Sequence, residues 1–159
     1  MQKLKVYLET TLFNFYVDMS MGFAHVNTVA LFDEIASGKY YGYTSAYVLD
    51  ELAQAPKEKQ DKMMRLIAQY NISVLSYSDQ ASALADVYVA EGVIPQKYRT
   101  DGLHIAIAAV NGLDMIVSMN FQHIVKRKTK LATGSINVLN GYRAVEIYTP
   151  MEVVENEDD

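Results

Sequence analysis

Residues 101–123, DGLHIAIAAVNGLDMIVSMNFQH, decide the fold. An acid at Asp101 marks the start of a helix, and residues 103–110 are apolar nearly all round, so this helix is predicted to be buried. Asn111-Gly112 is a usual helix end, and the short, partly β-branched run at 115–117 predicts a strand covered on both faces. The stretch therefore predicts a buried helix followed by a central strand.

Polar residues follow this strand directly, at Ser118 and Asn120. In open α/β sheets, ligands bind at the edge where the carboxyl ends of the strands meet. The loop after residue 117 is therefore a candidate part of a functional site.

The rest of the chain alternates between strand and helix patterns. Strands are predicted at 4–8, 40–43, 72–75 and 145–148, and helices at 26–35, 46–53, from Pro56 onward and at 79–91, while an aromatic segment at 12–17 opens a helix or a loop. Residues 121–141 are less regular and basic. This alternation predicts the α/β class, with a mostly parallel sheet and helices on both of its faces.

The composition indicates one domain. With 159 residues, 50% hydrophobic and 21% charged, the chain is long enough to bury a core without disulfides, and we expect a single domain at 1–150 and an acidic, frayed tail at 151–159. The absence of cysteine excludes disulfides and thiolate metal sites, so any metal is expected to be a hard cation held by oxygen. No apolar run approaches a membrane span, and the N-terminus lacks the apolar region of a signal peptide, so we expect a cytoplasmic protein with no membrane partner.

Three acids are placed where strands end or the following helices begin: Glu9, Glu51 and Asp101. Folding could therefore gather three carboxylates at one edge of the sheet, and such oxygen-rich clusters hold Mg²⁺ or Mn²⁺. Without a metal their mutual repulsion would raise the pKa of at least one of them. In the alternative interpretation each acid is ordinary, with Asp101 as a helix cap, Glu51 as a solvated helix residue and Glu9 as a strand-end charge.

Four segments in this order resemble the PIN-domain nucleases: VYLETTLFNFY, TSAYVLDELAQA, DGLHIAIAAVNGLDMIVSMNFQHI and VEIYTP. The third is the most specific, since an acid, a histidine three residues on within an apolar helix, a strand and Asn-Phe-x-His are rarely combined by chance. The resemblance implies a small three-layer α/β/α domain that cleaves RNA with a divalent metal.

Carried over by residue, the resemblance assigns the family's acidic positions to Glu9, Glu51, Asp101 and Asn120. The first three would be catalytic residues and ligands of Mg²⁺ or Mn²⁺, and Asn120 a catalytic-site contact to the metal or its water. The chain departs from the family at Glu9, which is commonly Asp, and at Asn120, where a neutral amide adds no charge and should weaken the hold on a second metal. Thr11 falls beside the first acid, where it could support a metal-bound water.

Two further features have both a functional and an ordinary interpretation. His104 is one helical turn from Asp101 and could support the same site, although a lone histidine on an apolar helix is more often a hydrogen-bonded core residue. Lys126, Arg127 and Lys128 could contact RNA phosphates, or they could form a solvated basic surface. The net charge of −5 argues against a generic nucleic-acid binder and permits only a local basic patch.

We expect a metal-dependent endoribonuclease, a hydrolase that is the toxin of a toxin–antitoxin pair, with RNA, a small antitoxin protein and a second copy of the chain as its partners. One alternative is a degenerate PIN-like domain that binds RNA or a protein and cleaves little. Another is a different α/β enzyme of phosphoryl chemistry, against which stands the absence of a Gly-rich phosphate loop.

Overall fold

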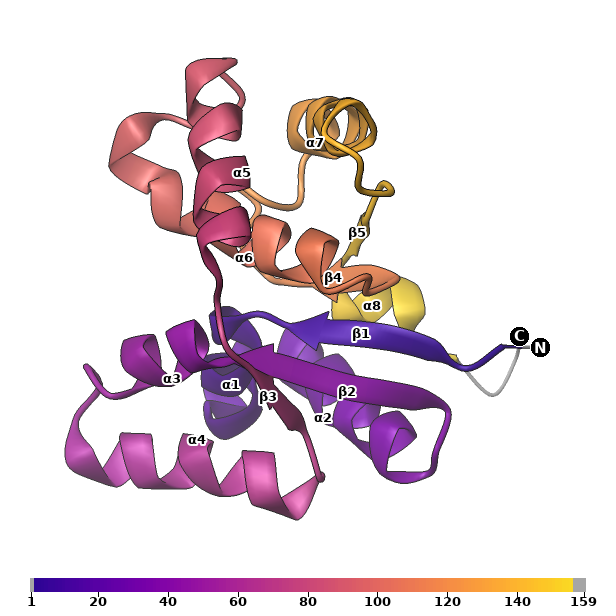
Figure 1. Cartoon of the computed structure of the whole chain (residues 1–159). Helices are drawn as coiled ribbons and strands as arrows, with labels where there is room; N and C mark the ends of the chain where they lie inside the picture. The colour runs from indigo at the N-terminus through magenta and orange to yellow at the C-terminus, as the bar shows by residue number, and fades with distance from the viewer. Residues whose placement is uncertain (1, 156–159) are drawn as a thin grey trace.

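The computed structural model describes residues 2–155 and contains one five-stranded sheet. All of its pairings are parallel, and the strand order is β3-β2-β1-β4-β5 (Figure 1). The strands are β1 (Leu4–Leu8), β2 (Tyr40–Ser45), β3 (Ser73–Leu75), β4 (Met115–Val117) and β5 (Glu146–Tyr148). Since every strand runs in the same direction, their carboxyl ends share one edge, and β1 occupies its centre.

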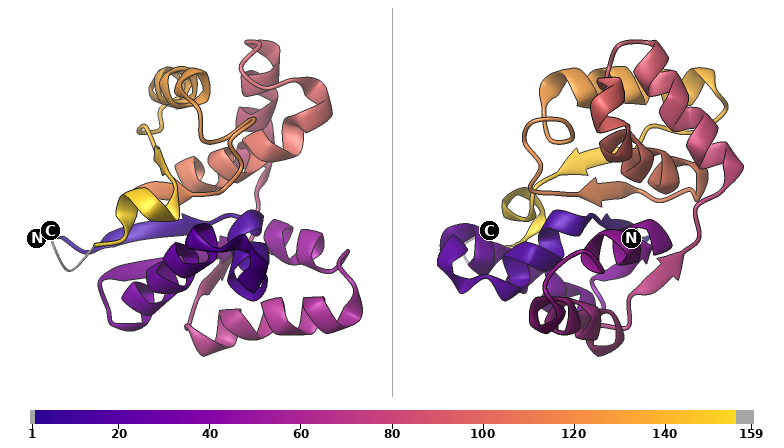
Figure 2. Two further views of the ribbon diagram at one scale, coloured as in Figure 1. Left: turned by 180° about the vertical axis from the view of Figure 1, so that it is seen from behind. Right: turned by 90° about the vertical axis from the view of Figure 1, so that its left-hand side faces the viewer.

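Helices cover both faces of this sheet. The helical elements are α1 (Thr10–Val17), η1 (Met19–Met21), α2 (Phe23–Ala36), α3 (Ala46–Leu52), α4 (Lys57–Gln69), α5 (Asp79–Ala90), η2 (Gln96–Tyr98), α6 (Arg99–Val110), α7 (Arg127–Leu139) and α8 (Pro150–Val153). Helices α1 to α4 lie on one side and α5 to α7 on the other, as Figure 2 shows from two further directions. The three-layer α/β/α class expected from the sequence is therefore confirmed. No helix within residues 2–155 is long and apolar enough to cross a membrane.

Helix α6 and strand β4 form the buried centre that the sequence predicts. Residues 102–109 of α6 and all three residues of β4 are buried. Helix α6 packs closely on α5, and a Cβ atom at Gly102 would lie 3.0 Å from Ile94 and 3.3 Å from Tyr88. The glycine at the start of the buried helix therefore permits this close approach.

The predicted start of this helix at Asp101 is wrong by two residues, because α6 begins at Arg99. The turn η2 leads directly into it, and Arg99 is anchored on α5 by its Nε atom, 2.6 Å from Asp86, and by a hydrogen bond to the Ser82 carbonyl. Asp101 therefore lies inside the first turn, and the cap position belongs to Tyr98. The interpretation of Asp101 as an ordinary helix cap is excluded.

Two other boundaries also differ from expectation. Most of the segment at 121–141, which has no clear periodicity, forms α7, whose buried side includes the polar residues Thr129, Thr133 and Asn137. Residues 151–153, expected in the tail, belong to α8, which a Pro at its first position and a Thr149–Glu152 capping box stabilise. Residues 154 and 155 of the expected tail follow α8, and residues 156–159 lie outside the described part of the chain.

Candidate functional site

Glu9 lies at the centre of the carboxyl edge, directly after β1. Its side chain is almost fully buried, with 3% of the residue exposed, and its Oε1 atom accepts hydrogen bonds from Thr11 at 2.6 Å and from Ser118 at 2.5 Å. Burying a carboxylate is costly unless hydrogen bonds replace its water shell, so these two hydroxyls hold Glu9 in place. In residues 2–155, every hydrogen bond to the Glu9 side chain is made to Oε1, which leaves Oε2 available to another partner.

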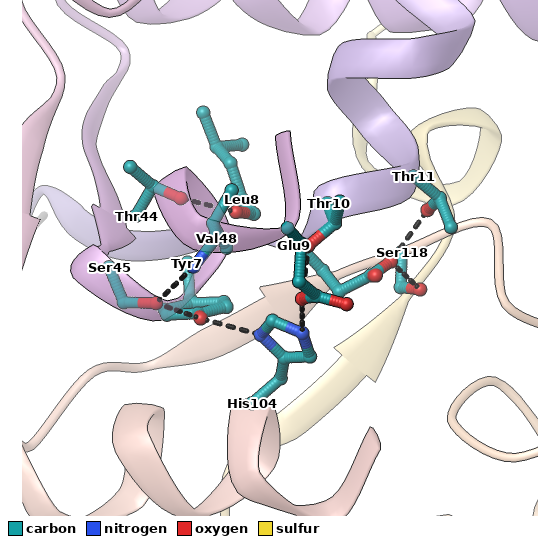
Figure 3. A network of polar contacts seen from close by, with 11 residues as sticks. Tyr7, Leu8, Glu9, Thr10, Thr11, Thr44, Ser45, Val48, His104 and Ser118 are labelled. Carbon is teal, nitrogen blue, oxygen red and sulfur yellow. Dashed lines mark hydrogen bonds and ion pairs between the residues drawn. The ribbon is translucent and has the colours of Figure 1, made fainter. Parts of the chain in front are cut away.

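The same two hydroxyls fix the loop after β4. Thr11 Oγ1 accepts from the Met119 amide at 2.9 Å, and Ser118 Oγ accepts from the Asn120 amide at 2.9 Å. A hydroxyl has one proton, and because each oxygen already accepts a backbone N–H, that proton is directed toward Glu9. Strand β1 and the loop after β4 are therefore joined through the carboxylate (Figure 3).

Glu51 approaches the same edge from the end of α3. Its Oε1 atom accepts from Thr10 at 2.7 Å and lies 2.6 Å from Nε2 of His104, which is buried on α6 with 1% of the residue exposed. Ser45 caps the start of α3, because its hydroxyl accepts from the Val48 amide. Glu51 is therefore a partly buried residue in a network, and its interpretation as a solvated helix residue is excluded.

His104 continues this network into the sheet. Its Nδ1 atom lies 2.7 Å from the Tyr7 hydroxyl, which lies 2.8 Å from the hydroxyl of Ser45 (Figure 3). Tyr7, Ser45 and His104 are all buried. Both interpretations of His104 are thus correct in part: it is a hydrogen-bonded core residue, and it also contacts a candidate site acid.

Electrostatics favour a charged His104–Glu51 pair. Burial opposes a charge on His104, but its hydrogen bond to Glu51 and the charges of Glu9, Glu51 and Asp101 together raise the pKa of the imidazole above its usual value. Burial likewise opposes charge on Glu51, yet the hydrogen bonds from His104 and Thr10 and the imidazolium charge lower the pKa of this carboxyl. All three acids therefore act on one buried histidine.

Asp101 is the third acid at this edge, and its pKa is raised. Burial is the main cause, and the charge of Glu51 adds to it, while hydrogen bonding from Asn120 and the nearby rings of His104 and His123 act in the opposite direction. A raised pKa was expected, but repulsion between the acids is only its minor cause. The Asn120 side chain also accepts the His123 amide at 3.1 Å, which fixes it within the loop after β4.

The donor set fits a hard cation in its chemistry. Glu9, Glu51 and Asp101 offer carboxylate oxygens, and in residues 2–155 the hydrogen bonds to Glu51, like those to Glu9, are made to Oε1 alone. Among the described residues, however, no three acidic or histidine side chains are already close enough together to enclose an ion. Their free oxygens would have to turn toward a shared ion on binding.

The basic residues lie at the start of α7. Lys126 and Arg127 are exposed, and the Lys128 ammonium donates to the Gly92 carbonyl at 3.0 Å. Asp114, in contrast, lies at the opposite edge of the sheet, where it accepts from the Lys5 amide and pairs with Arg143. Asp114 directly precedes β4, so it lies at the amino end of that strand and away from the candidate site.

Three residues of the network were not assigned to the site from sequence: Tyr7, Thr10 and Ser45. A usable signal existed for Thr10, since a hydroxyl residue directly beside a candidate acid falls at the same edge. Tyr7 gave no such signal, because a tyrosine in a strand is usually a packing residue.

The architecture defines a class of protein, the three-layer α/β/α domain with a parallel five-stranded sheet. A chain of this class is found in the crystal structure of VapBC2 from Rickettsia felis bound to a DNA fragment from their promoter, with a TM-score of 0.57 and 13% sequence identity, over 92% of this chain and 98% of that chain. At this identity the similarity establishes the fold alone. No family model and no curated protein matches the sequence.

Proposed function

We propose that the protein is a divalent-metal-dependent endoribonuclease. The single observation that best supports this is the placement of three acids from distant parts of the sequence at the carboxyl edge of the sheet: Glu9 directly follows β1, Glu51 lies 2.6 Å from His104, and Asp101 is in the first turn of α6. Ligand sites in parallel α/β folds lie at this edge. The resemblance to PIN-domain nucleases, which assigns the family's acidic positions to these same residues, supports the same chemistry.

Mg²⁺ or Mn²⁺ would be held by Oε2 of Glu9, Oε2 of Glu51 and the carboxylate of Asp101, with Asn120 beside them. Bound there, the ion would neutralise charge on a phosphodiester and lower the pKa of a water for in-line attack. The protein residues supply positioning. Thr11 and Ser118 hold Oε1 of Glu9, and His104 and Thr10 hold Oε1 of Glu51, so each carboxylate is anchored through one oxygen and would turn the other toward an ion.

The basic start of α7 is the proposed contact for RNA phosphates. Lys126 and Arg127 are exposed there, and the loop that precedes them contains Asn120 and His123. The chain has a net charge of −5, so as a whole it repels RNA. Two exposed positive residues, Lys126 and Arg127, would attract the phosphate backbone to this edge of the sheet.

We further propose that the chain is the toxin of a toxin–antitoxin pair and acts in the cytoplasm, with a small antitoxin protein as its partner. The similarity to a chain of VapBC2 and the resemblance to small stand-alone PIN-domain proteins support this. Co-expression with candidate small proteins encoded beside the gene, followed by co-purification, tests it. Size-exclusion chromatography of the isolated protein tests pairing with a second copy.

A degenerate domain that binds RNA or protein without cutting is the second candidate. The observations that favour it are the neutral Asn120 and the absence, among the described residues, of an acid cluster already arranged around an ion. Under this hypothesis the His104–Glu51 pair is purely structural, since the imidazole neutralises the carboxylate that a metal would otherwise need.

Cleavage of a pool of short, random-sequence RNAs separates these candidates. The parent protein, the Glu51→Gln variant and the Asp50→Asn variant are compared with Mg²⁺, with Mn²⁺ and with a chelator. Asp50 is the matched control, because it is the preceding acid on the same helix and is exposed. We expect metal-dependent cutting by the parent and by Asp50→Asn only. Failure of the parent to cut with either metal would reject the nuclease proposal, and equal cutting by Glu51→Gln would reject the site.

A further inference from the structure

Two aromatic rings are stacked at the rim of the candidate site. The rings of Tyr98 and His123 have centroids 4.0 Å apart and an interplanar angle of 25°. Tyr98 comes from the turn that leads into α6, and His123 from the loop after β4. The stack therefore joins the two segments that also position Asp101 and Asn120.

This stack is held in place by the protein on both sides. The His123 amide donates to Asn120 Oδ1 at 3.1 Å, and the His123 carbonyl accepts from the buried hydroxyl of Thr129 at 2.8 Å. Tyr98 is fixed by the hydrogen bond from its amide to the Pro95 carbonyl at 2.8 Å. Since the main chain of both residues is fixed and the two rings already contact each other, a ligand that stacks on them has less side-chain entropy to remove.

The stack is nevertheless accessible. Tyr98 is 37% exposed, and Phe121, two residues before His123, is 53% exposed. One cation lies against the stack, because Lys97 Nζ is 5.6 Å from the centre of the Tyr98 ring, and exposed Lys126 and Arg127 follow His123 by three and four residues in sequence. Flat rings with positive charge beside them complement a flat base that is flanked by phosphates.

The stack is also close to the reacting edge. Asp101 follows Tyr98 in the first turn of α6. The His123 amide donates to Asn120, whose own amide donates to Ser118, the residue that is hydrogen-bonded to Glu9. A base on the stack would therefore bring its neighbouring phosphodiester toward Glu9, Glu51 and Asp101.

We infer that the Tyr98–His123 stack is a binding subsite for one unpaired nucleobase of single-stranded RNA. This deepens the proposed nuclease function and rests on it for the choice of RNA. The faces of a base in a duplex are already covered by its neighbours, so the subsite selects unpaired nucleotides over paired ones. Every base has a π face and can stack on these rings, so the subsite is expected to prefer single-stranded over double-stranded RNA without selecting a sequence.

Binding in a chelating buffer, where no cutting occurs, tests this inference. The probe is a fluorescently labelled RNA of mixed sequence without self-complementarity, alone or annealed to its complement. We expect Tyr98→Leu to weaken binding of the single strand about tenfold, the scale of one lost base–aromatic stack, and to leave duplex binding unchanged. Tyr98→Phe keeps the ring and should bind as the parent does. His123→Gln removes the other ring from a different element and should also weaken single-strand binding.

Tyr41→Leu is the matched control. Tyr41 is an exposed tyrosine, at 48%, with Lys3 Nζ 4.0 Å from its ring centre, but it lies early in β2, toward the opposite edge of the sheet. We expect it to bind RNA as the parent does. In a salt titration, Tyr98→Leu should keep the parent's slope of log affinity against log salt, whereas Lys126→Gln should reduce that slope by about one unit. If Tyr98 were only structural, Tyr98→Leu would disturb the neighbouring cations as well, and both the affinity and the salt slope would change.

The outcomes distinguish the subsite from the enzyme activity. Unchanged single-strand binding by Tyr98→Leu, an equal loss for the duplex, or a loss as large in Tyr98→Phe would overturn the subsite, and metal-dependent cutting by the parent would then leave the nuclease proposal standing. Conversely, binding that depends on Tyr98 in a parent that never cuts would support the subsite and reject the nuclease. If the parent binds no RNA, the subsite is rejected, and the exposed rings are better assigned to a protein partner.

Discussion

Nε2 of His104 lies 2.6 Å from Oε1 of Glu51, while Nδ1 of the same ring lies 2.7 Å from the buried hydroxyl of Tyr7. The imidazole therefore connects an acid at the carboxyl edge of the sheet with a residue inside β1. Because Tyr7 is also hydrogen-bonded to Ser45 at the start of α3, both ends of the connection converge on the helix that contains Glu51. The pair is thus part of the scaffold and of the candidate site at once.

We predict that the pKa of His104 lies above its usual value near 6.5 and that Glu51→Gln lowers it. A histidine with a raised folded-state pKa stabilises the fold fully below its unfolded-state pKa, and this contribution disappears as the pH rises through the folded-state pKa. The free energy of unfolding should therefore fall above about pH 6.5 more steeply in the parent than in Glu51→Gln. Histidine NMR titration and denaturation at a series of pH values measure both effects.

Glu51 should have the opposite pH dependence at the acidic end. Its lowered pKa stabilises the fold above its usual value of 4.5, and this contribution is lost as the pH falls through the lowered folded-state pKa. The exposed Asp50→Asn variant is the control in both pH ranges, the one above about pH 6.5 for His104 and the acidic one for Glu51. If the free energy of unfolding depends on pH in the same way in the parent and in Glu51→Gln, in both the acidic and the neutral range, then His104 and Glu51 do not form a charged pair.

We expect Asp101→Asn to lower RNA cleavage on the order of 10²-fold or more, the scale of loss when one electrostatic contact to a reacting group is removed. The same change should stabilise the metal-free protein at neutral pH. Burial raises the pKa of Asp101 in the folded state above its unfolded-state value of 3.8. The protonated carboxyl is therefore compatible with folding below pH 3.8, but the fold loses stability as the pH rises through the folded-state pKa and the buried group becomes charged. An asparagine stays neutral at every pH and avoids that loss. Thermal unfolding in a chelating buffer measures the stability, and a destabilised variant would contradict the assignment.

Ser118→Ala should destabilise the protein by about 1–3 kcal/mol, the cost of leaving buried polar groups without a partner. The change removes a hydrogen bond to buried Glu9 and the acceptor of the Asn120 amide. Ser37→Ala is the control, because the Ser37 hydroxyl also makes one hydrogen bond, to the Glu34 carbonyl at 2.9 Å, but at an exposed position. Chemical denaturation of both variants measures the difference, and equal small effects would mean that the Glu9 carboxylate does not depend on Ser118.

Asn120→Asp should lower the concentration of Mn²⁺ that gives half-maximal cleavage, on the order of tenfold, since an added carboxylate strengthens the attraction for a hard cation. The aspartate keeps an acceptor for the His123 amide, so the loop should be retained. Metal titrations of cleavage and of thermal stability measure the change. Unchanged titrations would mean that residue 120 does not face the ion, and cutting by the variant alone would identify the parent as a degenerate nuclease.

The sequence by itself determined the architecture, for a physical reason that is local. The apolar runs at 103–110 and 115–117 can be buried in only a few ways, and helices that alternate with short apolar strands require parallel pairing. The same regularity placed Glu9 and Asp114 at opposite edges of the sheet, because one precedes a helix and the other precedes a strand. The start of α6, in contrast, depended on the contacts of Arg99 with α5, which no local pattern contains.

Only the tertiary structure decided how the acids are held. The hydrogen bonds from Ser118 to Glu9 and from His104 to Glu51 join residues 109 and 53 positions apart, so neither has a signature in sequence spacing. Whether a buried acid repels its neighbours or pairs with a histidine depends on distances of a few ångströms and on the exclusion of water. The sequence could therefore name Glu9, Glu51 and Asp101, whereas the partners that fix their charge and orientation emerged from the packing of β1, α3, α6 and the loop after β4.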